Sequence, residues 1–145
     1  MDVIVGFRNT FNYLLSDSGK SMATIGRESG ISPYVIMKWK KQSVDPKAKT
    51  LIKLADYFNC SIEYLCGKTN DYLDYKPQSC PAFGERLVEV LKASGWSSYK
   101  LFKQTKISPA QYHRWRKGME PLLSSLEAIA EALDVTLDYL VGRNR

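Results

Sequence analysis

The sequence predicts an all-α protein built from two tandem copies of one small helical domain. Residues 31–42 read "ISPYVIMKWKKQ" and residues 107–118 read "ISPAQYHRWRKG", with the same opening, a Trp at the same offset and a basic ending. A shift of 76 residues up to the Trp, and of 75 after it, aligns the apolar and glycine positions of the two halves. Apolar residues recur at helical spacing, and no stretch alternates for long enough to build a sheet. We therefore expect five helices in each copy.

The first two helices of each copy are predicted from apolar spacing and from their end signals. The first helix carries at helical spacing Phe7, Phe11, Leu14 and Leu15, or Phe83, Leu87, Val90 and Leu91. Gly19 and Gly95 are expected to end it, because glycine readily adopts the left-handed conformation of a helix end. A short second helix follows over 21–28 and over 97–104, and the serine that opens each range is a suitable N-cap.

The third helix contains the repeated phrase. Gly30 ends the second helix of copy one. Ser32-Pro33 and Ser108-Pro109 then place a serine at the N-cap and a proline at the first helical position, where its missing N–H does no harm. Two further helices fit "TLIKLADYF…SIEYLCG" and "SLEAIAEAL…TLDYLVG", and a hydroxyl residue precedes the last helix of each copy.

Between the copies, residues 69–82 read "TNDYLDYKPQSCPA", with two prolines and no helical period, and are predicted to be a linker. Fourteen extended residues reach at most roughly 46 Å. Tyr72, Leu73 and Tyr75 are expected to dock on one of the domains.

The flanking segments are the two predicted domains, residues 1–68 and residues 83–145. Their net charges are +4 and +3, whereas the linker carries −1, which makes up the total of +6. Two basic domains favour a polyanionic partner.

From the sequence we expect the chain to be a cytoplasmic protein. The sequence has no run of about 18 apolar residues that could span a membrane, and its first residues lack the basic and apolar regions of a secretory signal. The three cysteines, Cys60, Cys66 and Cys80, make no C-x-x-C pair, which favours free thiols in a reducing compartment. Because Val135 and Val141 align with the first two, we interpret those two as small buried apolar side chains.

The third helix of each copy has an apolar face and a basic face. Ile36 and Trp39 share one face and are predicted to be buried. In copy two the inward pair is Tyr112 and Trp115. The opposite faces carry Tyr34, Met37, Lys38 and Lys41 in copy one, and Ala110, His113, Arg114 and Lys117 in copy two.

Each copy resembles a lambda-repressor-like helix-turn-helix domain of the xenobiotic-response-element type. In copy one the resemblance rests on Phe7, Ile25, Gly30-Ile31-Ser32, Ile36, Trp39, Pro46, Leu51, Leu54-Ala55 and Tyr64-Leu65-x-Gly67. In copy two it rests on Phe83-Gly84-Glu85-Arg86-Leu87, Leu101, Ile107-Ser108, Trp115, Gly118, Pro121, Leu126, Ile129-Ala130 and Leu137-x-x-Leu140-x-Gly142. The resemblance implies binding to double-stranded DNA, with the third helix in the major groove. Small two-headed regulators of this kind are typical of bacteria and their phages.

The outward faces and the resemblance together give the predicted DNA contacts. In copy one they are Met22, Pro33, Tyr34, Met37, Lys38, Lys40, Lys41 and Gln42, and in copy two Ser98, Pro109, Ala110, His113, Arg114, Arg116 and Lys117. Arg114 can fork onto a guanine edge, and Lys38 can do so less rigidly. Phosphate contacts, which give affinity rather than sequence choice, are assigned to Lys40, Lys41, Arg116 and Lys117. The resemblance alone implies Met22 and Ser98.

Both copies depart from the usual residues of the family. The family usually has a small residue in the second helix, a glycine in the turn and an aliphatic residue on the inward face of the third helix. Copy one has these residues as Gly26, Gly30 and Ile36, whereas copy two has Phe102, Lys106 and Tyr112 in their places. We therefore expect the recognition helix of copy two to sit at an altered angle. Copy one departs at Met22, where a polar residue is common, and at Gln42, where Gly usually ends the helix, as Gly118 does in copy two.

Catalytic and metal-binding functions are not indicated by the sequence. His113 is the single histidine and has no Cys or carboxylate grouping near it, so we interpret it as a groove-facing polar residue. Trp39 and Trp115 are interpreted as core residues rather than as stacking platforms for bases. No phosphate loop, nucleophile elbow or carboxylate pair is recognisable, and we expect no enzyme activity, metal or cofactor.

The presence of two tandem copies favours one hypothesis about the function of the chain and leaves two others open. In the first, the chain is a covalent pseudo-dimer, a repressor that reads a bipartite operator with two recognition helices. In the second, copy two serves as a dimer contact and the chain works as a homodimer. In the third, the chain is a protein-interaction module such as an antitoxin or an inhibitor, because fold does not fix function.

Overall fold

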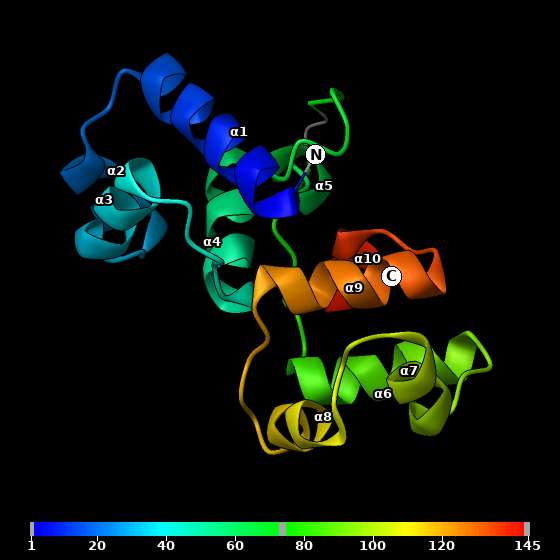
Figure 1. Cartoon of the computed structure of the whole chain (residues 1–145). Helices are drawn as coiled ribbons and strands as arrows, with labels where there is room; N and C mark the ends of the chain where they lie inside the picture. The colour runs from blue at the N-terminus through cyan, green and yellow to red at the C-terminus, as the bar shows by residue number, and fades with distance from the viewer. Residues whose placement is uncertain (1, 73–74, 144–145) are drawn as a thin grey trace. The chain divides into compact units, whose positions relative to one another are not determined.

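The computed structural model describes residues 2–72 and 75–143, and every regular element in these ranges is an α-helix. The all-α prediction is therefore confirmed. The chain divides into two compact units, called here unit one (Met1–Pro77) and unit two (Gln78–Arg145) (Figure 1).

The described helices follow the predicted order in both units. Unit one holds α1 (Val3–Ser18), α2 (Met22–Ser29), α3 (Pro33–Lys41), α4 (Ala48–Phe58) and α5 (Ile62–Leu65). Unit two holds α6 (Phe83–Ala93), α7 (Ser98–Gln104), α8 (Pro109–Arg116), α9 (Leu123–Leu133) and α10 (Leu137–Val141).

Hydroxyl side chains fix most of the helix starts. The Ser21 hydroxyl accepts a hydrogen bond from the backbone N–H of Thr24 at 3.1 Å, and Ser108 forms a capping box with Gln111 at the start of α8. The other serine and threonine caps are Ser32, Ser61, Ser97 and Thr136. Each such cap stabilises its helix by about 1 kcal/mol, which explains why the starts could be predicted from the sequence.

Helix ends agree with the prediction at two of the three glycines that were expected to end a helix. Gly19 and Gly30 are left-handed C-caps, with φ of 68° and 78°. In unit two α6 already ends at Ala93 with Ser94 as its cap, and Gly95 follows as the left-handed residue. The predicted end of this helix was therefore one residue late.

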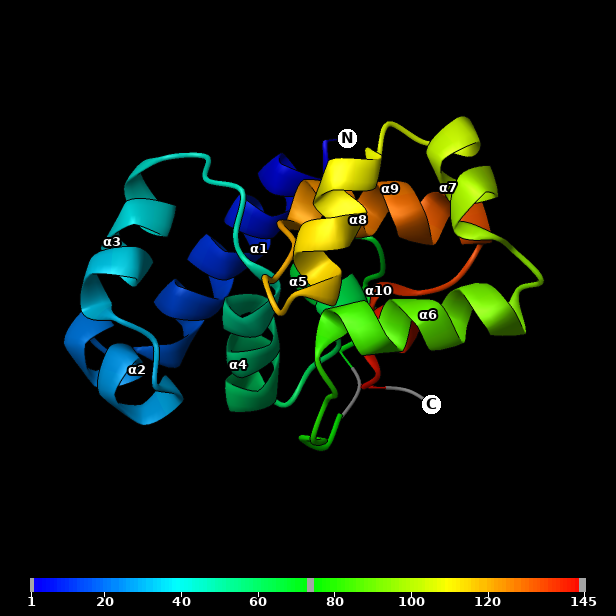
Figure 2. The same ribbon diagram turned by 90° about the horizontal axis from the view of Figure 1, so that it is seen from below.

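A tryptophan from the third helix lies in the core of each unit. Within unit one α1 packs on α3 and α5, α2 on α3, and α4 on α2 and α5 (Figure 2). The rings of Phe7 and Phe11 meet Trp39 edge-on, at centroid distances of 5.2 and 5.4 Å. Within unit two α6 packs on α8 and α10, and Phe83 meets Trp115 edge-on at 5.5 Å. The predicted core role of both tryptophans is confirmed.

The segment after α5 docks on unit one. The backbone N–H of Tyr75 donates to the carbonyl oxygen of Asn59 at 2.9 Å, and the Tyr72 hydroxyl donates to the carbonyl oxygen of Phe58. The Tyr72 ring also meets Tyr64 edge-on, at 4.9 Å between centroids. The docking predicted for Tyr72 and Tyr75 is therefore confirmed, whereas Leu73 lies outside the described residues.

All three cysteines lie among the described residues. Cys60 and Cys66 are buried, as predicted, and Cys80 is half-buried. Among the described helices even α1, with 16 residues, is too short to be a membrane-spanning segment.

Candidate nucleic-acid interface

The recognition helix of unit one, α3, is seated by two buried residues. Ile36 is fully buried and Trp39 is 2% exposed, so the inward face predicted from their spacing is confirmed. α2 crosses α3 where Gly26 meets the turn, and a Cβ built on Gly26 would lie 2.8 Å from the carbonyl oxygen of Ile31 and 2.9 Å from the ring of Pro33. Only glycine fits this approach, and contact between α2 and α3 is the most extensive among the described helices.

In unit two, α8 is seated differently. Trp115 is buried, but Tyr112 is only half-buried, so the inward prediction for Tyr112 is correct only in part. Its ring meets Phe102 of α7 edge-on at 5.7 Å. Because this aromatic pair stands where unit one has a glycine, direct contact between α7 and α8 is slight.

The end of each recognition helix contacts a residue of the first helix for which the sequence analysis predicted no such contact. In unit one the Arg8 guanidinium donates to the carbonyl oxygens of Lys40 and Lys41, at 3.2 and 3.1 Å. In unit two the aligned residue is Gly84, and a Cβ there would lie 2.3 Å from the carbonyl oxygen of Trp115. The alignment of "FRNTF" with "FGERL" could have indicated this contact, because it pairs the long side chain of Arg8 with a glycine.

The predicted contacts lie mostly on exposed surface. Those that are exposed are Pro33, Tyr34, Met37, Lys38, Lys40, Lys41 and Gln42 in unit one, and Pro109, Ala110, His113, Arg114, Arg116 and Lys117 in unit two. Met22 and Ser98, which only the resemblance implied, are half-buried at the first turns of α2 and α7. Each unit thus brings its set together on and around one recognition helix.

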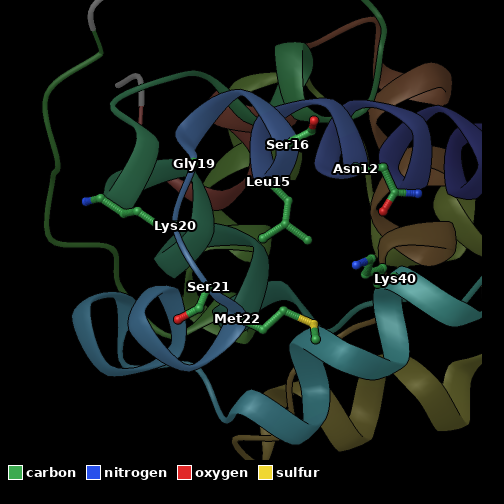
Figure 3. Close-up of a pocket in the computed structure, with 8 residues that line it drawn as sticks. All are labelled: Asn12, Leu15, Ser16, Gly19, Lys20, Ser21, Met22 and Lys40. Atoms are coloured by element: carbon green, nitrogen blue, oxygen red, sulfur yellow. The ribbon is translucent and has the colours of Figure 1, made fainter.

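An open hollow of about 700 Å³ borders this set in unit one (Figure 3). Met22 from α2 and Lys40 from α3 lie on it, together with Asn12 of α1. The N-terminal N–H groups of α2 and the Lys40 ammonium give this region positive polarity, which suits a phosphate oxygen.

A charged cluster on the outer side of α2 is neutralised within unit one. The Tyr57 hydroxyl and the Lys20 ammonium both contact the Glu28 carboxylate, at 2.5 and 2.9 Å. These hydrogen bonds, that of Tyr57 first, lower the pKa of Glu28, and the Glu28 carboxylate in turn raises the pKa of Lys20. Lys20 is therefore paired with Glu28, whereas the end of α3 carries the exposed Lys40 and Lys41.

Unit two carries additional cations on α7. Lys100 lies over the Trp96 ring at 4.4 Å, and Lys103 lies over the exposed Tyr99 ring at 5.5 Å. The sequence analysis missed both lysines. Their spacing of three residues on the exposed side of a short helix is the signal that could have found them.

Family comparisons agree with this geometry in both units. Residues 14–65 match the helix-turn-helix family model, and residues 86–144 match the model of the Cro/C1-type helix-turn-helix DNA-binding domain. The chain is a tandem lambda-repressor-like helix-turn-helix protein. No curated protein and no solved structure gives a significant match.

Membership of this family makes the tandem helix-turn-helix protein a DNA-binding transcription regulator. Within the described ranges, no group of three or more His, Cys, Asp or Glu side chains is placed to hold a metal ion.

Proposed function

We propose that this tandem helix-turn-helix protein is a transcriptional repressor whose two recognition helices read the two unlike halves of one operator. The observation that carries this proposal is that the same scaffold presents two different exposed sets. α3 presents Tyr34, Met37 and Lys38 where α8 presents Ala110, His113 and Arg114. Different side chains at the base edges select different bases, so the half-sites are unlike.

The roles within each set follow from side-chain chemistry. Arg114 donates two parallel hydrogen bonds to the O6 and N7 atoms of a guanine, and Lys38 makes the weaker equivalent contact in unit one. Phosphate oxygens are bound by the lysines and arginines at the helix ends, Lys40, Lys41, Arg116 and Lys117. In unit one, Met22 and Lys40 border the hollow into which a backbone phosphate fits, beside the α2 N-terminus.

The tether, residues 69–82, makes the second binding event intramolecular. With Tyr72 and Tyr75 released from unit one, its extended length of roughly 46 Å exceeds the separation of about 34 Å between half-sites one helical turn apart. Two weak contacts therefore combine into tight binding without a second chain. Binding of a compact operator excludes other proteins from that stretch of DNA, which is the basis for assigning repression.

The proposal is tested by selecting sites from random double-stranded DNA at about 150 mM salt, with the mass of the complex measured in parallel. A bipartite, non-palindromic site bound by one chain is the expected result. A palindrome bound by two chains contradicts it.

A second candidate is that unit two mediates dimerisation or binding of a protein partner. It is favoured by the exposed apolar side chains of unit two, which include Tyr99, Met119 and Leu122 at 66%, 59% and 41% exposure. In this version Arg114→Ala leaves DNA affinity unchanged, whereas Lys38→Ala abolishes binding. Analytical ultracentrifugation of the Tyr99→Ser/Leu122→Ser variant would then give a monomer where the parent chain is a dimer.

A further inference from the structure

Unit two buries an arginine of its own against a tyrosine. The Arg86 side chain is 6% exposed, and its Nη2 and Nε atoms donate to the carbonyl oxygen of Tyr139 at 2.7 and 3.2 Å. Its guanidinium carbon also lies 4.7 Å from the centroid of the Tyr139 ring. One tyrosine thus binds a guanidinium group by its carbonyl oxygen and by its ring.

Unit one has the same tyrosine but not the arginine. The repeat aligns Tyr64 with Tyr139, Gly67 with Gly142, and Thr10 with Arg86. A threonine side chain is too short to fill the space that an arginine fills. The structure accordingly has a hollow of about 250 Å³ here, lined by Thr10, Tyr64, Gly67 and Asn70 among others.

The surroundings of Tyr64 favour a positive charge. Burial raises the pKa of the Tyr64 hydroxyl, and the negative charges that Tyr13, Cys60 and Asp17 carry when ionised raise it further. The Asp17 carboxylate lines an adjoining hollow of about 350 Å³, on which Tyr13 and Tyr64 also lie. In the hollow beside Thr10 an anion would be repelled by this nearby carboxylate, whereas a cation would meet the rings of Tyr13 and Tyr64.

We propose that the hollow beside Thr10 binds a small molecule with a guanidinium group. That group lies over the Tyr64 ring and donates to the Tyr64 carbonyl oxygen, as Arg86 does to Tyr139. The hollow is smaller than the roughly 300–1,000 Å³ of sites for drug-sized ligands, so the ligand is of single-amino-acid size. α2 and α3, which carry the predicted DNA contacts of unit one, take no part in this site.

The position of the site gives it a route to regulation. The Tyr64 ring that the ligand covers also contacts Tyr72, which docks the segment after α5 onto unit one. A ligand on Tyr64 therefore changes the surface to which the tether is held. The binding inference itself is independent of the operator proposed above, because its test uses no DNA.

The test is a titration of the ¹⁵N-labelled full chain with L-argininamide, followed by NMR. L-citrullinamide is the matched control ligand, because it replaces the guanidinium by an uncharged urea group of nearly the same shape. The expected result is saturable shifts of the Thr10, Gly67 and Asn70 amide signals with argininamide, and binding at least tenfold weaker with citrullinamide. Equal binding of the two ligands, or shifts spread over both units, would overturn the proposal.

A second test of ligand binding uses substitutions at Thr10 that fill the hollow. Thr10→Arg fills the hollow from within, so it abolishes argininamide binding and raises the melting temperature of unit one. Thr10→Met fills the same space with an uncharged side chain and likewise abolishes binding, which keeps the test decisive if Thr10→Arg fails to fold. Tyr99→Leu, an exposed tyrosine of unit two, is the control and leaves binding unchanged. Retention of binding in a folded Thr10→Arg or Thr10→Met variant contradicts the proposal.

Discussion

The two units hold equivalent recognition helices by opposite distributions of small and large residues. At one pair of aligned positions unit one has Arg8 and unit two has Gly84, and at a second pair unit one has Gly26 and unit two has Phe102. In unit one the close backbone approach is therefore at the start of α3, where α2 crosses it. In unit two it is at the end of α8, against α6.

This comparison shows that the position of the glycine determines which end of the recognition helix packs closely against a neighbouring helix. Close contact needs a residue without Cβ, and the other end then needs a long side chain to complete the contact. Arg8 does this through hydrogen bonds to two carbonyl oxygens, whereas Phe102 does it by packing on Tyr112. The exposed faces of α3 and α8 are consequently positioned by different contacts, so a substitution in one set of contacts leaves the other set unchanged.

The largest effect is expected from Gly84→Ala. The added Cβ would lie 2.3 Å from the carbonyl oxygen of Trp115, and backbone cannot move aside cheaply. We expect unit two to lose about 3 kcal/mol of unfolding free energy. Denaturant unfolding followed by NMR should show an early transition of unit two and an unchanged transition of unit one. Val88→Ala on the exposed side of α6 is the control, and equal stability of the two variants would contradict this account.

Arg114→Ala should weaken binding to the selected operator by about 2 kcal/mol, roughly thirtyfold. The loss should concentrate at one base pair of the half-site read by unit two. Binding measured to operators altered at single positions checks this, because the variant should no longer discriminate at that pair. Lys117→Ala is the comparison, since loss of a phosphate contact weakens binding to all sequences alike and lowers the salt dependence. If Arg114→Ala weakened binding to all sequences alike, Arg114 would not be a base-reading residue.

Arg8→Ala should destabilise unit one by about 1 kcal/mol, because two hydrogen bonds at the end of α3 are lost while water can reach the freed carbonyl groups. Hydrogen exchange of the last α3 amides should become faster, with α8 unaffected. The control is Arg27→Ala, which removes an exposed arginine from α2. An equal change of exchange in both variants would show that net charge, rather than the Arg8 contact, matters.

The smallest effect is expected from Tyr57→Phe, and it depends on pH. The Tyr57 hydroxyl is the first cause that lowers the pKa of Glu28 below 4.5, so the ionised carboxylate favours the folded state. That contribution is present above pH 4.5 and is lost as the pH falls through the lower pKa of the folded protein. Tyr57→Phe should therefore slightly lower the melting temperature of unit one at neutral pH and make no difference in strong acid. A difference that persists at low pH would show that the hydroxyl acts by packing.

The fold could be predicted from the sequence because its signals are local. Serine caps, proline at the first helical position and apolar spacing all act within one helix, and the repeat reports each of them twice. Contacts between helices were harder to predict. Arg8 meets carbonyl groups 32 and 33 residues away, and nothing in its own helix marks that contact.

The candidate site was predicted where helical geometry alone decides exposure, and less well where packing decides it. Tyr112 is at the inward position by spacing, but the bulk of Phe102 leaves it half-buried. Lys100 and Lys103 were not predicted, because they lie on α7 and the face of the third helix carries no signal for them. Spacing gives the direction of a side chain, whereas its depth depends on the neighbouring helix.

The docking of Tyr72 and Tyr75 on unit one shortens the part of the tether that can extend away from that unit. With both tyrosines docked, residues 76–82 remain beyond the docked part, and seven extended residues span at most about 23 Å. With both released, the full segment doubles that reach. Under the proposed function, a docked segment permits only closely spaced half-sites, whereas a released segment permits wider spacings. Under that proposal the docking of two tyrosines, rather than the recognition helices, sets the spacing between half-sites that one chain can bind.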